Sequence, residues 1–74
     1  MLYRGDNMNI GNKLKIIRKK CLLSQVNFAK EINVSFSTVN RWENNKNIPN
    51  YQALKKIKDF CDKKGIPFEI DDEN

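Results

Sequence analysis

The strongest constraint on the fold is a pair of short helical patterns, with only two residues between the end of the first and the N-cap of the second. Apolar residues at helical spacing predict one helix over residues 25–32, and Ser24 before it is a favourable N-cap. Ser35 offers the cap of a second helix over residues 36–44. Two helices joined so closely cross with little room between them. A residue at their crossing point therefore has to be small.

Two further amphipathic helices are expected to flank this pair. The first covers residues 10–21 with Asn9 as its N-cap, and its apolar residues recur at positions i, i+3 and i+7. The last covers residues 51–64, begins after Asn50 and ends at Gly65, a natural residue for the turn that closes a helix. The expected fold class is all-α, a compact bundle of four to five helices.

The chain is expected to form one folded domain with a looser segment at each end. A flexible N-terminal arm is expected at residues 1–8, the domain at residues 9–65 and an extended acidic tail at residues 66–74. Apolar residues alternate along the start of this tail, which is a weak signal for extended chain: Ile66, Phe68 and Ile70. This strip either closes the small core or forms a surface for dimerisation.

The charge of the chain is concentrated in its body. The net charge of the 74 residues is +5, but four of the nine acidic side chains fall within residues 69–74. Residues 1–68 therefore carry 14 basic and 5 acidic side chains, a net charge of +9. Such an excess suits a polyanionic partner, because neutralised phosphates release condensed counterions. The alternative is that the lysines only keep a small protein in solution.

Several classes of function are disfavoured by what the chain lacks. It has no histidine, and its two cysteines, Cys21 and Cys61, have no metal-binding spacing, so we expect no metal, no cofactor and no enzymatic activity. Both cysteines are interpreted as core thiols of a reducing cytoplasm. The sequence shows no signal peptide and no membrane-spanning run, and nothing points to a small-molecule substrate.

On a helical wheel, the helix at residues 36–44 divides into two sides. Val39 and Trp42 lie on the inner side, whereas the outer side carries one aromatic, one hydroxyl, two amides and one guanidinium: Phe36, Ser37, Asn40, Asn44 and Arg41. Side chains of these types read base edges in the major groove of DNA. The alternatives are a surface helix in an asparagine-rich chain, and a Phe36 side chain that packs into a crevice.

The segment QVNFAKEINVSFSTVNRWEN, residues 25–44, resembles the helix-turn-helix of the Cro/C1-type (lambda-repressor-like, XRE) family. The family has an apolar residue followed by alanine early in its first helix, and apolar residues on both sides of the turn. It also has two apolar anchors in the second helix, and this chain supplies the whole set: Phe28, Ala29, Ile32, Val34, Val39 and Trp42. Leu-Ser-Gln at residues 23–25 and the exit after Glu43 are also similar. The resemblance covers residues 10–62.

The resemblance implies a sequence-specific regulator of transcription that binds double-stranded DNA, as a repressor and as a homodimer. It implies that the second helix of the pair enters the major groove. The residues implied to contact DNA are Gln25, Ser35, Phe36, Ser37, Thr38, Asn40, Arg41, Asn44 and Lys46. Within this set, Gln25 would bind a phosphate, while Asn44 and Lys46 would hold phosphates on the other flank. Arg18 and Glu43 would form a structural ion pair.

Three positions depart from the family pattern, which often has glycine where this chain has Leu22, Asn33 and Asn45. Asparagine enters the left-handed backbone region more readily than other residues with a side chain, so the two asparagines are compatible with the turns. Leu22 implies either a first connection of different shape, or strain in a residue that covers the core. A second function is also open: a protein-interaction module, antitoxin or adaptor that uses the same fold.

Overall fold

The computed structural model describes residues 9–69, and the expected N-terminal arm and most of the acidic tail lie outside this range. The described chain forms four helices and no strand: α1 (Ile10–Lys20), α2 (Gln25–Glu31), α3 (Phe36–Glu43) and α4 (Tyr51–Lys64). The all-α prediction is confirmed. The observed bounds of α4 agree with the prediction, and the first three helices each end one residue earlier than predicted.

Each of the four helices begins with the same local interaction. The side chain of an N-cap residue accepts a hydrogen bond from the backbone N–H group three residues later, at 2.9–3.1 Å. This bond satisfies one of the N–H groups that have no partner inside the helix. The capping residues are the four that the sequence predicts: Asn9, Ser24, Ser35 and Asn50.

Each helix also ends in the same way. A residue with left-handed backbone follows the helix, and the N–H group of the next residue bonds the carbonyl five positions back. The left-handed residues are Leu22, Asn33, Asn45 and Gly65, with φ angles of 58°, 59°, 60° and 71°. The first connection thus keeps this turn geometry, and Leu22 bears the strain. Its side chain is 92% exposed, however, so it does not cover the core.

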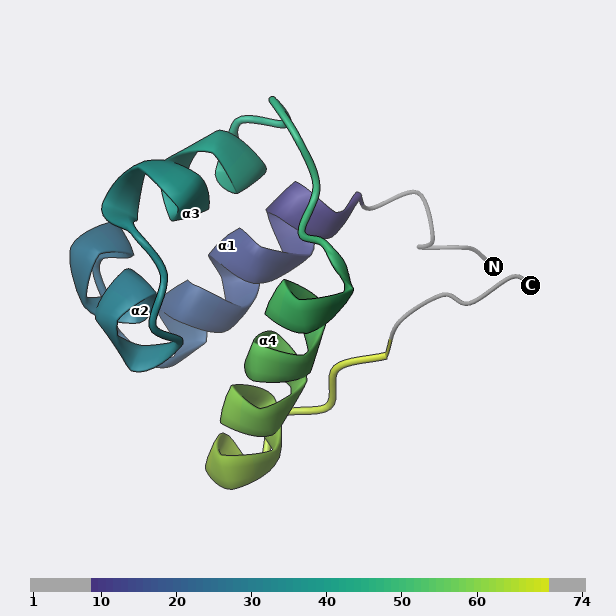
Figure 1. The fold of residues 1–74 in the computed structure, drawn as a ribbon. Coiled ribbons are helices and arrows are strands. Elements are labelled where there is room, and N and C mark those ends of the chain that lie inside the picture. The colour runs from purple at the N-terminus through teal and green to yellow at the C-terminus, as the bar shows by residue number, and fades with distance from the viewer. Residues whose placement is uncertain (1–8, 70–74) are drawn as a thin grey trace.

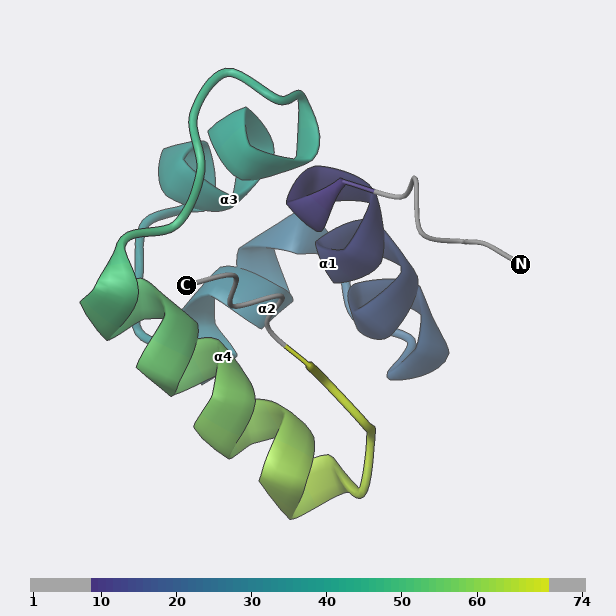
Figure 2. The ribbon, with the colours of Figure 1, turned by 90° about the vertical axis from the view of Figure 1, so that its right-hand side faces the viewer.

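The helices pack around one small core (Figures 1 and 2), with α3 at the top of both views, α4 at the bottom, and α1 and α2 between them. Phe28 of α2 and Phe60 of α4 meet edge to face, with ring centroids 5.4 Å apart. Ala29 at the α2–α3 crossing is 2% exposed, in agreement with the need for a small residue there. Cys61 is also part of the core, whereas Cys21 is half-buried at its edge.

The segment after α4 contributes to the core. Phe68 is 5% exposed, and Ile66 packs against the same cluster of buried side chains. The first two residues of the apolar strip therefore close the core, and Ile70 lies outside the described residues. The core thus continues beyond residue 65, the predicted end of the folded domain.

Candidate nucleic-acid interface

The two sides of α3 are separated in the structure as the helical wheel predicts. Val39 and Trp42 are 0% and 3% exposed, and they anchor the helix in the core. Phe36, at the start of the opposite side, is 48% exposed and does not pack into a crevice. Along the rest of this side, Asn40 is half-buried and three residues are exposed: Ser37, Arg41 and Asn44. We call Phe36, Ser37, Asn40, Arg41 and Asn44 the outer face of α3.

Three hydroxyl groups cluster at the amino end of α3. Ser35 Oγ caps the helix and lies 2.7 Å from Thr38 Oγ1 and 3.2 Å from Ser37 Oγ. The positive end of the helix dipole lies at the same place. Hydroxyl donors beside a helix amino terminus are suited to an anionic group such as a phosphate. The structure therefore brings together three of the predicted contact residues where DNA backbone contacts would be useful.

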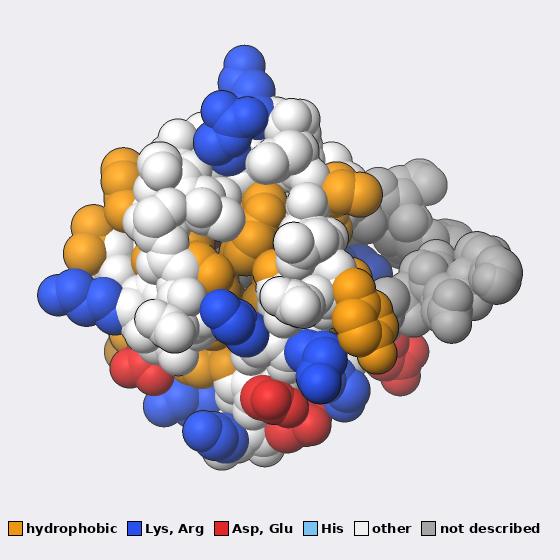
Figure 3. All heavy atoms as spheres, viewed as in Figure 1, with side chains coloured by type: hydrophobic (Ala, Val, Ile, Leu, Met, Phe, Trp, Pro, Cys, Tyr) orange, Lys and Arg blue, Asp and Glu red, His pale blue; other side chains and the backbone are white. Residues whose placement is uncertain are grey.

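Charge is distributed unevenly over the surface. On the side seen in Figure 3, acidic side chains lie in the lower half of the molecule, away from α3. Arg41 and Lys46 are both exposed near the carboxyl end of α3, where the Lys46 backbone N–H group donates to the Arg41 carbonyl at 2.8 Å. The outer face of α3 is thus polar and bordered by basic rather than acidic side chains.

An ion pair holds the carboxyl end of α3 to α1. Arg18 Nε donates to Glu43 Oε2 at 2.8 Å, and Arg18 Nη2 donates to Glu43 Oε1 at 3.0 Å. The third arm of the guanidinium, Nη1, donates to the Leu23 carbonyl at 2.9 Å and so fixes the α1–α2 connection as well. This is the structural pair that the family resemblance implies. Only 1% of the Glu43 side chain is exposed.

The Glu43 carboxyl group remains charged in this buried position. Burial by itself raises its pKa, but hydrogen bonds from Arg18 and Gln25 and the charges of Arg18 and Lys15 act in the opposite direction. The net result is a pKa below the ordinary value of a glutamate. A buried carboxylate with a paired arginine and further donors is the arrangement that tolerates burial of charge.

Gln25, expected to bind a phosphate, lies between this carboxylate and the outer face of α3. Its Nε2 donates to Glu43 Oε1 at 2.9 Å, and its Oε1 accepts from Asn40 Nδ2 at 3.1 Å. Asn40 Oδ1 accepts in turn from Asn44 Nδ2 at 3.2 Å. Sequence reasoning missed this chain of amides, because it depends on which sides of α2 and α3 face each other. We call Gln25, Asn40 and Asn44 the amide chain.

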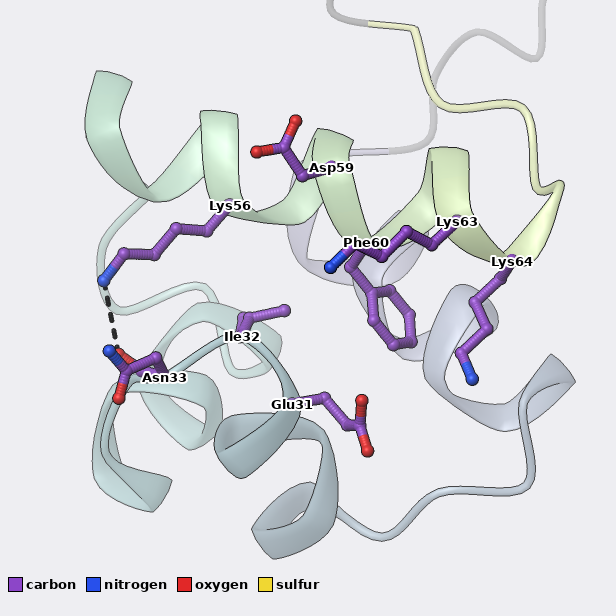
Figure 4. A pocket seen from close by; sticks show the side chains of 8 residues that line it. All are labelled: Glu31, Ile32, Asn33, Lys56, Asp59, Phe60, Lys63 and Lys64. Carbon is purple, nitrogen blue, oxygen red and sulfur yellow. Dashed lines mark hydrogen bonds between the residues drawn. The ribbon is translucent and has the colours of Figure 1, made fainter.

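One hollow on the described surface is an open groove. It has a volume of about 320 Å³ and lies between the end of α2 and α4 (Figure 4). Lysines and acids both line it, and Lys56 Nζ donates to the Asn33 carbonyl at 3.3 Å. Its lining contains no serine, cysteine or histidine. Among residues 9–69, no group of three or more potential ligands could hold a metal ion.

Among the helices of residues 9–69, none has the length and apolar character needed to cross a membrane. Comparisons with curated proteins and with solved structures returned no match. A helix-turn-helix family model, in contrast, matches residues 14–66, which is more than half of the chain. The matched range contains α2, the turn and α3 together with the outer face of α3 and its ion pair to α1. The chain belongs to the Cro/C1-type helix-turn-helix family of DNA-binding regulators.

Proposed function

We propose that this protein is a sequence-specific regulator of transcription that binds double-stranded DNA and acts as a repressor. The observation that carries the proposal is the outer face of α3, which projects amide, hydroxyl and guanidinium groups opposite the buried anchors Val39 and Trp42. Such groups form hydrogen bonds with base edges, and an α-helix fits the major groove. Repression fits a domain that binds without catalysis, because occupation of a promoter is sufficient.

In the proposed mechanism, phosphate contacts position the protein on the DNA and base contacts determine the sequence that it selects. The lysines attract the duplex, and phosphate contacts from the Ser35 and Thr38 hydroxyl groups and from Lys46 set the position of the protein along it. Ser37 and Arg41 then meet base edges, with Arg41 suited to a bidentate contact with guanine. Phe36, at the amino end of α3, would contact a thymine methyl group.

We propose that the protein binds as a homodimer on two half-sites about one helical turn apart. One α3 helix contacts only a few base pairs, so a second copy is needed for strong selectivity. Ile48 and Tyr51 offer an apolar surface for this contact at the start of α4, with 73% and 76% of their areas exposed. A palindromic binding site would support the dimer.

The test is a selection of bound sequences from random duplexes with the wild-type protein and two variants. Arg41→Ala is expected to weaken specific binding by about 1–3 kcal/mol and to relax preference at one base pair. Lys46→Ala is the matched control, because it removes a neighbouring charge that is expected to contact only phosphate. It should weaken binding to all sequences alike. An unchanged base preference in Arg41→Ala would refute the proposed role of α3.

The exposed Phe36 side chain also favours a second candidate, a protein-interaction module of the same fold such as an antitoxin or adaptor. Titration with random duplex DNA at two salt concentrations separates the two functions. A steep decrease of affinity with salt supports DNA binding, since phosphate contacts release counterions. A protein that does not bind duplex DNA at low salt would favour the interaction module.

A further inference from the structure

The amide chain begins at a group that can only accept hydrogen bonds. The ionised Glu43 carboxylate has no proton to donate, and it already binds two N–H groups of Arg18. Gln25 must therefore turn its Nε2 atom, and not its Oε1 atom, toward Glu43. The distance of 2.9 Å between Gln25 Nε2 and Glu43 Oε1 is that of a charge-assisted hydrogen bond. The buried charge thus determines which way the Gln25 amide faces.

The orientation of Gln25 determines the next two amides. Its Oε1 atom faces Asn40, so Asn40 has to present Nδ2, which donates at 3.1 Å. Asn40 Oδ1 then faces Asn44, whose Nδ2 donates to it at 3.2 Å and to the Asn40 carbonyl at 2.9 Å. Reversal of one amide alone would place oxygen against oxygen or N–H against N–H. The amide chain therefore has one favoured direction from the core to the surface.

The direction of the amide chain leaves oxygen atoms available at the surface. Asn44 Nδ2 has two acceptors on Asn40 for its two N–H groups, whereas Asn44 Oδ1 accepts no hydrogen bond from residues 9–69. Asn40 keeps one lone pair of Oδ1 and the second N–H group of Nδ2 unused within the described chain, so Asn40 can still accept or donate, whereas Asn44 can only accept. In the major groove, the base atoms that donate hydrogen bonds are adenine N6 and cytosine N4. Phosphate oxygens have no proton to donate.

We propose that Glu43, acting through Gln25 and Asn40, fixes Asn44 as a hydrogen-bond acceptor and so selects adenine or cytosine at the base that Asn44 meets. This inference rests on the proposed DNA-binding function and adds to it a rule for base choice. It differs from the phosphate contact expected for Asn44 from the family resemblance. Gln25 is then a positioning residue, which acts on base preference through Asn40.

The test compares base preferences of variants by selection from random duplexes. Asn44→Ala first identifies the base position concerned, which should carry adenine or cytosine in sequences selected by the wild-type protein. Gln25→Met removes both ends of the Gln25 amide and keeps an unbranched side chain. We expect the preference at that position to decrease about fivefold relative to the preferences at the other base positions, whatever the change in overall affinity. Asn27→Ala, an exposed amide of the same helix, is the matched control and should retain the preference.

Two additional variants separate positioning from stability. Gln25→Lys retains a donor to Glu43 but provides no oxygen for Asn40, so it should lose the same base preference even if Gln25→Met folds poorly. In the Asn40→Ala background, Gln25→Met should cause no further change in preference, because coupled residues are not additive. If Gln25 only stabilised the fold, its replacement would lower the Tm without changing the preference at one base position selectively.

An NMR measurement on the free protein tests the amide chain without DNA. The side-chain amide protons of Gln25, Asn40 and Asn44 should exchange with solvent more slowly than those of Asn27. Equal exchange rates would overturn the amide chain itself. Selection of guanine or thymine by Asn44, or an unchanged preference in both Gln25 variants, would overturn the proposed base choice. A wild-type protein without any base preference would overturn the proposed function and the base choice together, while the exchange rates would still report on the amide chain.

Discussion

Gly11 in the first turn of α1 lies directly against the backbone carbonyl of Trp42, at the end of α3. A Cβ atom at position 11 would overlap this carbonyl oxygen and come within 2.7 Å of Asn45 Oδ1. The obstacle is backbone, which cannot rotate away as a flexible side chain can. The absence of a side chain at residue 11 thus allows α1 and α3 to approach, and it helps to determine the angle at which the outer face of α3 is presented.

We expect Gly11→Ala to lower the free energy of unfolding by about 1–3 kcal/mol, as overpacked cores do. The expected sign opposes the intrinsic helix preference of alanine, which favours the substitution by about 1 kcal/mol in an unconstrained helix. Urea unfolding of both proteins measures the difference. Asn12→Ala, at the next and exposed position, is the control and should change stability little. Equal or greater stability of Gly11→Ala would show that α1 and α3 do not meet this closely.

The two ion pairs of the described chain should differ in their contribution to stability. Arg18→Met leaves the buried Glu43 charge without its main partner, and we expect a loss of about 3 kcal/mol. Lys58→Met breaks the ion pair between Lys58 and Asp62, whose two side chains are 48% and 60% exposed, respectively. This loss should lower the free energy of unfolding by less than about 1 kcal/mol. Guanidinium unfolding of the two variants side by side gives the comparison. Equal losses would contradict the importance assigned to burial.

The strained turn after α1 provides a substitution that should stabilise the protein. Leu22 has a φ angle of 58°, which costs a side-chain-bearing residue about 1–2 kcal/mol, and its exposed side chain buries almost no area. Glycine removes this strain but gives the unfolded chain more freedom, so Leu22→Gly should raise stability by about 0.5–1 kcal/mol. Thermal unfolding would show a higher Tm. Leu23→Gly, at the half-buried neighbour, should lower it instead.

Because the thiol of Cys61 is buried, the free energy of unfolding should depend on pH in the alkaline range. Burial, together with nearby Cys21 and Asp62, raises the pKa of Cys61 from 9.0 to about 11. The unfolded chain loses this proton first as the pH rises, so the contribution of Cys61 to stability decreases between pH 9 and pH 11. Unfolding of the wild type and of Cys61→Ala at pH 8 and pH 10.5 isolates the effect. The stability difference between them should become smaller at pH 10.5, and a constant difference would contradict the raised pKa.

The local features of this fold could be predicted from the sequence. Among the long-range features, the Arg18–Glu43 ion pair was implied by the family resemblance, but others could not be predicted. Capping by Ser24 and Ser35 involves residues three positions apart, so residue type and spacing were sufficient. The need for an absent side chain at Gly11 arises only when α1 and α3 pack together. The direction of the Gln25 amide likewise depends on Glu43, a distant residue in another helix. Phe68 follows a weak extended signal that did not distinguish core from surface.

The four residues with left-handed backbone after the helices are all exposed, and they belong neither to the core nor to the outer face of α3. Of the four left-handed positions, only Gly65 has the residue best suited to that backbone. Replacement of Leu22 or Asn33 is expected to change the free energy of unfolding in small steps and to leave the groups presented to DNA in place, because neither residue is next to the outer face of α3 in the chain. A lineage moving to a warmer environment can therefore adapt this domain at its turns while its binding sites in the genome stay the same.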